Sequence, residues 1–296
     1  MTINPALALS IAVAILSQAA ILIRFAQAPP LAILFWRLAI AFVILLPFQR
    51  LSFREVNTLR PRDWGRWVLA GFSFFLHFYS FFVSVQQSSI AASNILFCLN
   101  TVTTAAGAWL FFSHRLSARV AISIALGASG VAMLFASSSA LAGSQNTLGL
   151  WSGVGSALTF SIYILVGKSL RTKLSNLTYT LGLWLMAIGF ALVAMLMTAT
   201  PFFSYSPQSW LAFGLLAILP TLIGHATFTW CLNHIDINVL SAATLVEPVL
   251  ASVVAILILN EHLDMRTVIA FLLTSASVLW LSWPGLQRRL RRKYGH

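Results

Sequence analysis

The chain has 296 residues, of which 59% are hydrophobic and 8% are charged. Its mean hydropathy of +0.89 leaves too little polar surface for a soluble domain of this length, which excludes a soluble globular fold. A formal net charge of +12 would suggest nucleic-acid binding in a soluble protein, but here the positions of the basic residues between apolar segments explain it. We therefore expect an integral membrane protein with no nucleic-acid partner.

Apolar runs of about 17 to 25 residues, the length that crosses a bilayer as a helix, follow one another along the chain. The ten runs are Pro5–Phe25, Leu31–Phe48, Arg66–Val85, Ile90–Phe112, Val120–Ser137, Leu148–Gly167, Leu177–Ala199, Trp210–Leu232, Val239–Leu259 and Thr267–Pro284. The sequence therefore predicts an all-α integral membrane protein with ten transmembrane helices.

The first run is followed by Ala26-Gln27-Ala28, an A-x-A pattern of the kind found at signal-peptide cleavage sites. We interpret the run as a retained helix, because the basic region that precedes the apolar core of a signal peptide is missing. Cleavage would also leave nine helices and a broken repeat.

Fifteen of the eighteen basic residues fall in connections that alternate along the chain, and so on one side of the membrane. They are Arg50, Arg54, Arg60, Arg62, Arg66, Arg115, Arg119, Lys168, Arg171, Lys173, Arg288, Arg289, Arg291, Arg292 and Lys293. The positive-inside rule makes that side the cytoplasm, with both termini in it. We interpret the basic C-terminal tail as a topology anchor, although contact with anionic lipid is the alternative.

Shifting the sequence against itself by 147 residues places Asn94–Ser117 over Ser241–Asp264, with Asn100 on Glu247. Five helices in each half give the halves opposite orientations, because an odd number of crossings reverses the chain direction. Such inverted repeats are typical of secondary transporters, whose substrate sites lie near the membrane midplane between the halves. We predict two inverted five-helix repeats, residues 1–142 and 143–296.

Polar side chains recur at helical spacing within the predicted helices. The small and hydroxyl residues among them need no explanation beyond close helix packing. A larger polar group in lipid needs a partner or a task, and an aromatic residue either lines a cavity or faces lipid. The residues that we predict to bind substrate are Gln18, Arg37, His77, Asn100, Tyr163, Trp184, His225 and Glu247.

Glu247 stands beside Pro248 in an apolar stretch. A charge at the centre of a membrane helix costs roughly 2.5 to 3.5 kcal/mol on insertion scales, so it is rarely present without a partner or a task. We predict that Glu247 couples transport to protons by binding a proton and the ammonium group of a substrate in alternation. Arg37 is the alternative ion-pair partner. Pro248 is expected to kink its helix, because it lacks an N–H group and crowds the carbonyl of Thr244.

The sequence shows no motif for a disulfide framework, a metal site or a catalytic site. Cys98 and Cys231 fall within apolar helices, so neither a disulfide framework nor a metal cluster is indicated. The sequence contains no glycine-rich phosphate loop, nucleophile elbow or HExxH spacing. We expect no catalytic residue, no metal and no cofactor.

Several segments are similar to parts of a known repeat. The segment "LVEPVLASVVAILILNEHL", followed by a short turn and "VIAFLLTSASVLWL", pairs a proline-containing helix with a final helix. It resembles the end of the EamA repeat of the drug/metabolite transporter superfamily. "LAILFWRLAIAFVILLPF", which contains Arg37, resembles the second helix of that family, and "ALTFSIYILVGKSL" resembles the sixth. The Gly-Glu-Arg-Leu-like turn of the family keeps Glu261 here, but has Asn260 and His262 for its glycine and arginine.

The resemblance implies a ten-helix carrier that exports amino acids or other small metabolites across a bacterial inner membrane. Independently of it, the repeat, the polar stripes and the acid at midplane depth favour a carrier. Export of cationic drugs is the alternative within carriers, because Glu247 is a counter-charge for them. A channel or a membrane-embedded enzyme would need a filter sequence or a catalytic constellation, and neither is recognisable.

Overall fold

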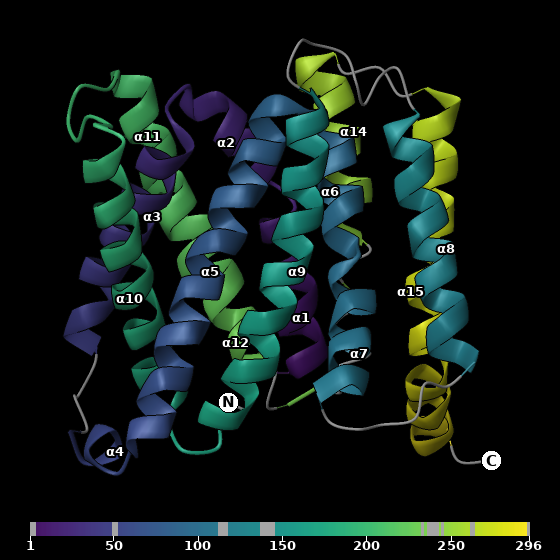
Figure 1. Cartoon of the computed structure of the whole chain (residues 1–296), viewed down its shortest axis with the longest axis horizontal. Coiled ribbons are helices and arrows are strands. Elements are labelled where there is room, and N and C mark those ends of the chain that lie inside the picture. Colours follow the sequence, from purple (N-terminus) through teal and green to yellow (C-terminus); the bar gives the residue numbers. More distant parts are fainter. Residues whose placement is uncertain are drawn as a thin grey trace.

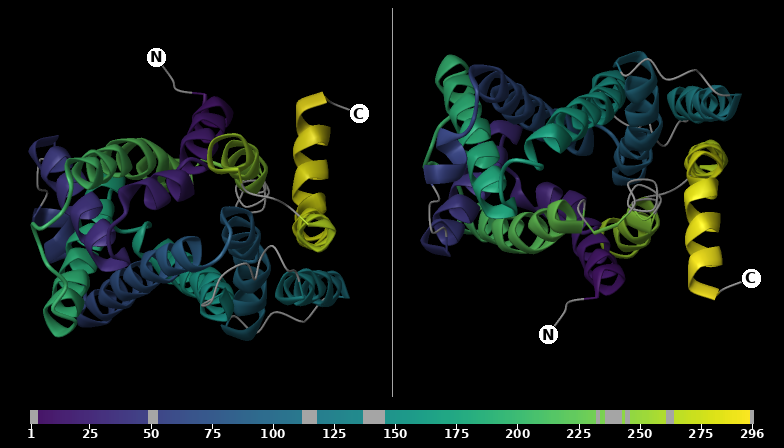
Figure 2. Two further views of the ribbon diagram at one scale, coloured as in Figure 1. Left: turned by 90° about the horizontal axis from the view of Figure 1, so that it is seen from above. Right: turned by 90° about the horizontal axis from the view of Figure 1, so that it is seen from below.

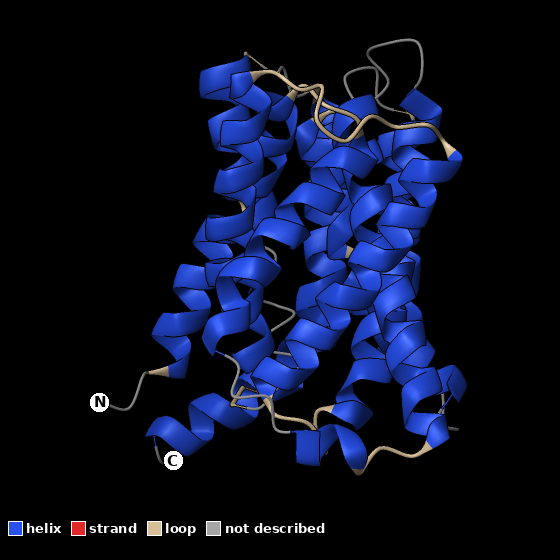
Figure 3. Ribbon diagram, turned by 90° about the vertical axis from the view of Figure 1, so that its left-hand side faces the viewer, coloured by secondary structure: helices blue, strands red, loops and turns tan. Residues whose placement is uncertain are grey.

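Every regular element that the structure describes is a helix (Figure 1). The computed structural model describes residues 4–48, 53–111, 118–136, 146–231, 234–235, 243, 246–260 and 264–294. The all-α prediction is confirmed for this part of the chain, and Figure 3 draws helices and loops there without a strand. Helices suit a membrane because they satisfy their own backbone hydrogen bonds where no water is at hand.

The helices begin and end as follows. They are α1 (Pro5–Leu16), α2 (Ala19–Ala26), α3 (Pro30–Leu45), η1 (Leu46–Phe48), α4 (Phe53–Asn57), α5 (Pro61–Gln87), α6 (Ile90–Cys98), α7 (Asn100–Phe111), α8 (Ala118–Phe135), α9 (Asn146–Leu170), α10 (Asn176–Met197), α11 (Pro207–Leu216), η2 (Ala217–His225), α12 (Ala226–Cys231), α14 (Val246–Leu259) and α15 (Met265–Tyr294).

Six helical segments among the described residues are long and apolar enough to cross a membrane. They are Pro5–Ala26, Pro30–Phe48, Pro61–Gln87, Thr147–Leu170, Asn176–Met197 and Pro207–Cys231. Four shorter apolar helices are Ile90–Thr104, Ala121–Phe135, Val246–Leu259 and Met265–Trp280. These segments overlap the ten predicted runs one by one, while the number of membrane crossings stays a prediction.

The outer faces of the helices are apolar, as a lipid-facing surface requires. Met197 on α10 and Leu257 on α14 are 82% and 75% exposed, and large aliphatic side chains on α1, α3, α9 and α15 are exposed as well. A soluble protein rarely exposes so much contiguous apolar surface. The exposure therefore indicates burial in a bilayer.

The helices pack into one large group and one pair at its side. In the large group α5 lies along α9, α10 packs on α3 and α5, α11 on α2, and α1 on η2. The pair is α8 and α15, which lie side by side at one edge of the bundle and touch the rest mainly through α6 and α7 (Figures 1 and 2). Most of the apolar core lies within the large group.

Two of the predicted helices are interrupted at positions where a polar side chain donates a hydrogen bond to a nearby backbone carbonyl. The first breaks at Ser17 and Gln18, between α1 and α2, where the Ser17 hydroxyl donates to the carbonyl of Ala14 at 2.8 Å. The fourth breaks at Leu99, between α6 and α7, where the Asn100 amide donates to the carbonyl of Phe97 at 2.7 Å. Such local bonds offer the backbone an alternative to the regular helical ladder.

A third predicted helix continues from α11 to α12 through the π-helical segment η2. Pro220 lies inside η2 and has no N–H to donate to the helix. The Thr221 hydroxyl donates to the carbonyl of Leu216 at 2.8 Å, which occupies that carbonyl within the widened turn. π-Helical turns of this kind are rare and occur often at functional sites.

Two other prolines lie in described helices. Pro248 lies in α14, and the carbonyl of Thr244, on which the expected kink depends, is outside the described residues. Pro284 lies inside α15, which continues to Tyr294 instead of ending at the proline. Towards its C-terminal end α15 turns away from its earlier direction (Figure 2), as proline inside a helix causes.

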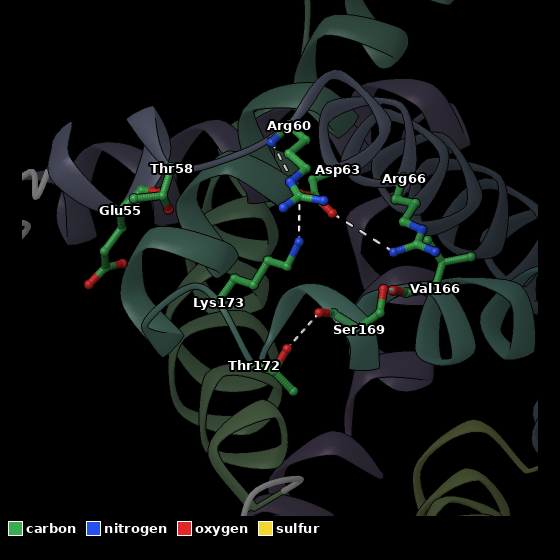
Figure 4. A network of polar contacts seen from close by, with 9 residues as sticks. All are labelled: Glu55, Thr58, Arg60, Asp63, Arg66, Val166, Ser169, Thr172 and Lys173. Atoms are coloured by element: carbon green, nitrogen blue, oxygen red, sulfur yellow. Dashed lines mark hydrogen bonds and ion pairs between the residues drawn. The ribbon is translucent and has the colours of Figure 1, made fainter.

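A network of paired charges joins α4 and α5 to the connection between α9 and α10 (Figure 4). The carboxylate of Asp63 accepts from the backbone N–H of Arg60 at 3.1 Å and from Lys173 Nζ at 2.7 Å, and lies 3.8 Å from Arg66 Nη1. The carboxylate of Glu55 accepts from the backbone N–H of Ser175 at 2.9 Å. This α4-end network occupies the end of the bundle where α1 begins and α15 ends (Figure 1).

Candidate functional site

A cavity lies where the interrupted helices meet. Its volume is about 40 Å³, which gives room for a few water molecules. Its wall consists of Leu16, Ala19, Arg37, His77, Phe78, Phe81, Asn94, Phe97, Phe160, His225, Phe228 and Glu247. Both sides of the α1–α2 break and the last residue of η2 contribute to it. A small metabolite would enter only after the wall moves.

Arg37 comes from α3 and is fully buried. Its Nε donates to the hydroxyl of Thr221 on η2 at 2.9 Å. Its guanidinium carbon lies 4.3 Å from the ring centre of Phe78 and 5.4 Å from that of Phe82, two residues one helical turn apart on α5. Nη2 is buried without a hydrogen-bond partner. A cation is thus held in the wall by aromatic faces and one hydroxyl.

Two histidines reach the cavity from different helices. His77 on α5 places Nδ1 2.9 Å from the hydroxyl and 3.2 Å from the carbonyl oxygen of Ser156 on α9. His225 ends η2 and lies edge-on to Phe78, with ring centres 5.0 Å apart. The two histidines come from the two halves of the chain, and the structure brings them to one wall of the cavity. Their role in substrate binding stays a prediction.

Glu247 is the acid in the cavity wall, and it lies on α14. Among the described residues no hydrogen bond or ion pair reaches its carboxyl group, and Arg37 lies in the same wall without pairing to it. The carboxyl group of Glu247 can therefore accept hydrogen bonds from a ligand.

The other predicted site residues lie outside the cavity wall. Asn100 begins α7 directly after the break at Leu99, and its backbone carbonyl accepts from the hydroxyl of Ser161 on α9 at 3.0 Å. Gln18 occupies the α1–α2 break, where its amide donates to the Ser17 hydroxyl at 2.8 Å. Tyr163 packs behind the wall against Phe160, with ring centres 5.4 Å apart, and Trp184 is buried in the core of α10. The structure therefore separates these residues from Arg37, His77, His225 and Glu247.

The aromatic wall consists mostly of phenylalanines. Phe97 and Phe228 lie at helical spacing from the predicted site residues Asn100 and His225, whereas Phe78, Phe81 and Phe160 were not predicted from the sequence. Asn94 on α6 also lines the wall without having been predicted. Its position three residues before Phe97 was the signal that could have identified it.

Metal binding finds no support in the described part of the chain, where no group of three or more His, Cys, Asp or Glu side chains could hold an ion. Both cysteines are buried. The turn residues Glu261 and His262, and their first-half counterparts, lie outside the described residues.

The sequence model of the EamA-like transporter family matches two successive parts of the chain, residues 4–136 and 147–283. The chain belongs to the EamA-like transporter family. This membership makes it a multi-pass membrane transporter, and it agrees with the apolar helices and with the resemblance inferred from the sequence.

Two relatives of this EamA-like protein are named uncharacterized transporters. One, from Clostridium kluyveri, is 24% identical over 239 residues, which cover 78% of this chain and 76% of that protein. The other, from Archaeoglobus fulgidus, is 25% identical over 282 residues, which cover 93% of this chain and 95% of that protein. Neither name specifies a substrate.

A protein of known crystal structure has a similar fold. It superimposes with a TM-score of 0.66 at 16% sequence identity, over 95% of this chain and 98% of that chain. At this identity the likeness concerns the fold alone.

Proposed function

We propose that this EamA-like protein is a secondary transporter that exports small metabolites, with amino acids the favoured substrates, by alternating access. The observation that carries this function is the carboxyl group of Glu247, which lies in a small cavity between interrupted helices and has no partner among the described residues. Discontinuous helices around a central site are the arrangement by which many carriers hold their substrates. The small volume fits a closed stage of such a cycle.

Two inverted repeats, residues 1–142 and 143–296, would supply the two halves that rock about the site. Support comes from the family model, which matches two successive parts of the chain. Further support comes from the cavity wall, to which each half of the chain contributes a histidine, His77 and His225. With five crossings in each half, all ten helices cross the membrane and the halves face opposite ways.

The membrane is a bacterial inner membrane, with both chain termini in the cytoplasm. The α4-end network supports this orientation, because Arg60, Arg66 and Lys173 lie together (Figure 4) at the end of the bundle where α1 begins and α15 ends (Figure 1). Arg24 lies at the other end of α5, where it donates to the carbonyl of Ser88. The denser group of positive charges is expected on the cytoplasmic side.

Glu247 is the exchange point, at which a proton and the ammonium group of the substrate displace each other. The charged or titratable side chains that share its cavity are Arg37, His77 and His225, and Cys98 lies on the adjacent helix α6. Since Arg37 is not paired with the carboxylate, either cation can reach it. A ligand that binds one state of the carrier better than the other shifts the equilibrium between them.

The test replaces Glu247 with glutamine, which keeps shape and hydrogen bonding but cannot titrate. The purified protein in proteoliposomes is given a panel of radiolabelled amino acids and cationic dyes at several pH values. Glu247→Gln should abolish the pH dependence of transport and weaken the recognition of amines. The matched control is Glu55→Gln, which changes an acid in the α4-end network. Wild-type rates and unchanged pH dependence in Glu247→Gln would make Glu247 a structural acid only.

Export of cationic drugs is the second candidate, and the phenylalanine wall favours it. Aromatic faces attract organic cations, and Glu247 would neutralise their charge. The buried cation of Arg37 in the same wall acts against it, because it repels a ligand that carries only positive charge. Efflux of the dyes without transport of any amino acid would decide for the second candidate.

A further inference from the structure

Arg37 is held in one orientation by contacts on two sides. The hydroxyl of Thr221 donates its proton to the carbonyl of Leu216, so its lone pairs are free to accept from Arg37 Nε. The guanidinium carbon lies over the rings of Phe78 and Phe82, 4.3 and 5.4 Å from their centres. A planar guanidinium fixed in this way loses little conformational entropy when it binds a ligand.

The terminal nitrogens of Arg37 remain available. Nη2 is buried without a hydrogen-bond partner, and no ion pair to Arg37 occurs among the described residues. Burying an unpaired cation costs free energy that a well-packed apolar residue would save. Because Nε is already bonded to Thr221, the fork formed by Nη1 and Nη2 is the part left for a ligand.

The cavity wall contains one group for each end of a zwitterion. Arg37 offers a guanidinium to an anionic group of a ligand, and Glu247 offers a carboxyl to a cationic one.

We infer that Arg37 is a preorganised binding site for a carboxylate, so that the substrates carry a carboxylate together with the amine that Glu247 receives. Two parallel N–H···O bonds match the Nη1–Nη2 fork to a carboxylate. The substrate class is therefore the zwitterionic amino acid, with its apolar side chain against the phenylalanines of the wall. This assignment rests on the proposed transport function and adds a second polar contact to it.

The test measures binding of three probes that share one side chain. They are phenylalanine, 2-phenylethylamine, which lacks the carboxylate, and 3-phenylpropanoate, which lacks the amine; leucine, isopentylamine and 4-methylpentanoate form a second series. Dissociation constants are measured by isothermal titration with the full-length protein in lipid nanodiscs. We expect the amino acids to bind the wild type at least about tenfold more tightly than either single-charge analogue, since each analogue leaves one buried charge unpaired.

Arg37→Lys keeps the positive charge but removes the planar fork. It should weaken binding of the amino acid and of the carboxylic acid about tenfold or more and leave binding of the amine unchanged. Thr221→Val keeps the shape of the side chain and removes the acceptor for Arg37 Nε. This variant should weaken binding of the amino acid and of the carboxylic acid to a smaller extent. It tests the carboxylate site if Arg37→Lys does not fold.

Several outcomes would overturn the carboxylate site. These are equal affinity of the wild type for amino acid and amine, no binding of any carboxylate-bearing probe, or unchanged amino-acid affinity in the folded Arg37 or Thr221 variants. Glu247→Gln separates this result from the proposed exchange role. If Glu247→Gln binds amines normally while Arg37→Lys loses the carboxylic acids, the exchange role fails and the carboxylate site stands.

Discussion

The cavity and the α4-end network contain the same kinds of residue in opposite circumstances. In the network the carboxylate of Asp63 is surrounded by Lys173, Arg66 and a backbone N–H, and the two cationic side chains are about 40% exposed. In the cavity Arg37 and Glu247 are both buried, and neither has a partner of opposite charge among the described residues. One region has paired its charges and the other has kept them apart.

The difference separates charges that hold the fold from charges that serve a ligand. At the rim, water screens the ions and pairing costs little, so the charges can fasten α4 and α5 to the α9–α10 connection. In the interior an unpaired ion lowers stability, and its persistence indicates a task. Deleting charges should therefore cost stability in the network and function in the cavity.

The largest effect is expected from removing both cavity charges. The double variant Arg37→Met, Glu247→Gln should reduce transport to background, because neither polar end of the substrate keeps its partner. Its thermal unfolding midpoint should equal or exceed that of the wild type, because two unpaired buried charges are gone. Proteoliposome flux and unfolding in detergent measure the two quantities. A clearly lower midpoint would mean that the cavity charges hold the fold after all.

A smaller effect, on stability alone, is expected from Asp63→Ala. This variant removes the acceptor for the N–H of Arg60 at the start of α5 and leaves Lys173 without its ion pair. The unfolding midpoint should fall, while flux per folded molecule should stay near the wild-type value. Lys173→Met is the matched variant on the other side of the pair. Loss of flux in both variants, without loss of stability, would assign the network to the transport cycle.

The smallest effect is the pH dependence of the stability that the Glu55 carboxylate contributes. The backbone N–H of Ser175 donates to this carboxylate and holds its pKa below the ordinary value of 4.5. The folded state therefore releases the proton more readily than the unfolded chain, so the stabilisation is present above the unfolded pKa and is lost as the pH falls through the folded pKa.

The wild type should accordingly unfold at a slightly higher temperature than Glu55→Gln at about pH 7, with the difference vanishing in acid. Unfolding midpoints of the two proteins over a pH series measure it. A difference that grows in acid would show that another group is responsible.

The local pattern of apolar and polar residues predicted the helices and part of the candidate site. Runs of apolar residues located every described helix except the short segments, because length and hydropathy are local properties. Glu247, Arg37, His77 and His225 could be selected from the sequence because large polar groups are conspicuous in lipid. Asn100 does not line the cavity, and its amide donates to the carbonyl of Phe97 at the end of the preceding helix. Its role in substrate binding stays a prediction.

The sequence by itself determined that the chain is a helical membrane protein and which polar side chains its membrane segments must accommodate, because hydrophobic length and the cost of burying charge depend on composition alone. Only the tertiary structure decided which of those side chains meet. The breaks after α1 and α6 and the π-helical turns around Pro220 change the helical register. Packing of α3 against α5 and η2 then stacks Arg37 on Phe78 and joins it to Thr221. These contacts span up to 184 positions along the chain, beyond the reach of local periodicity.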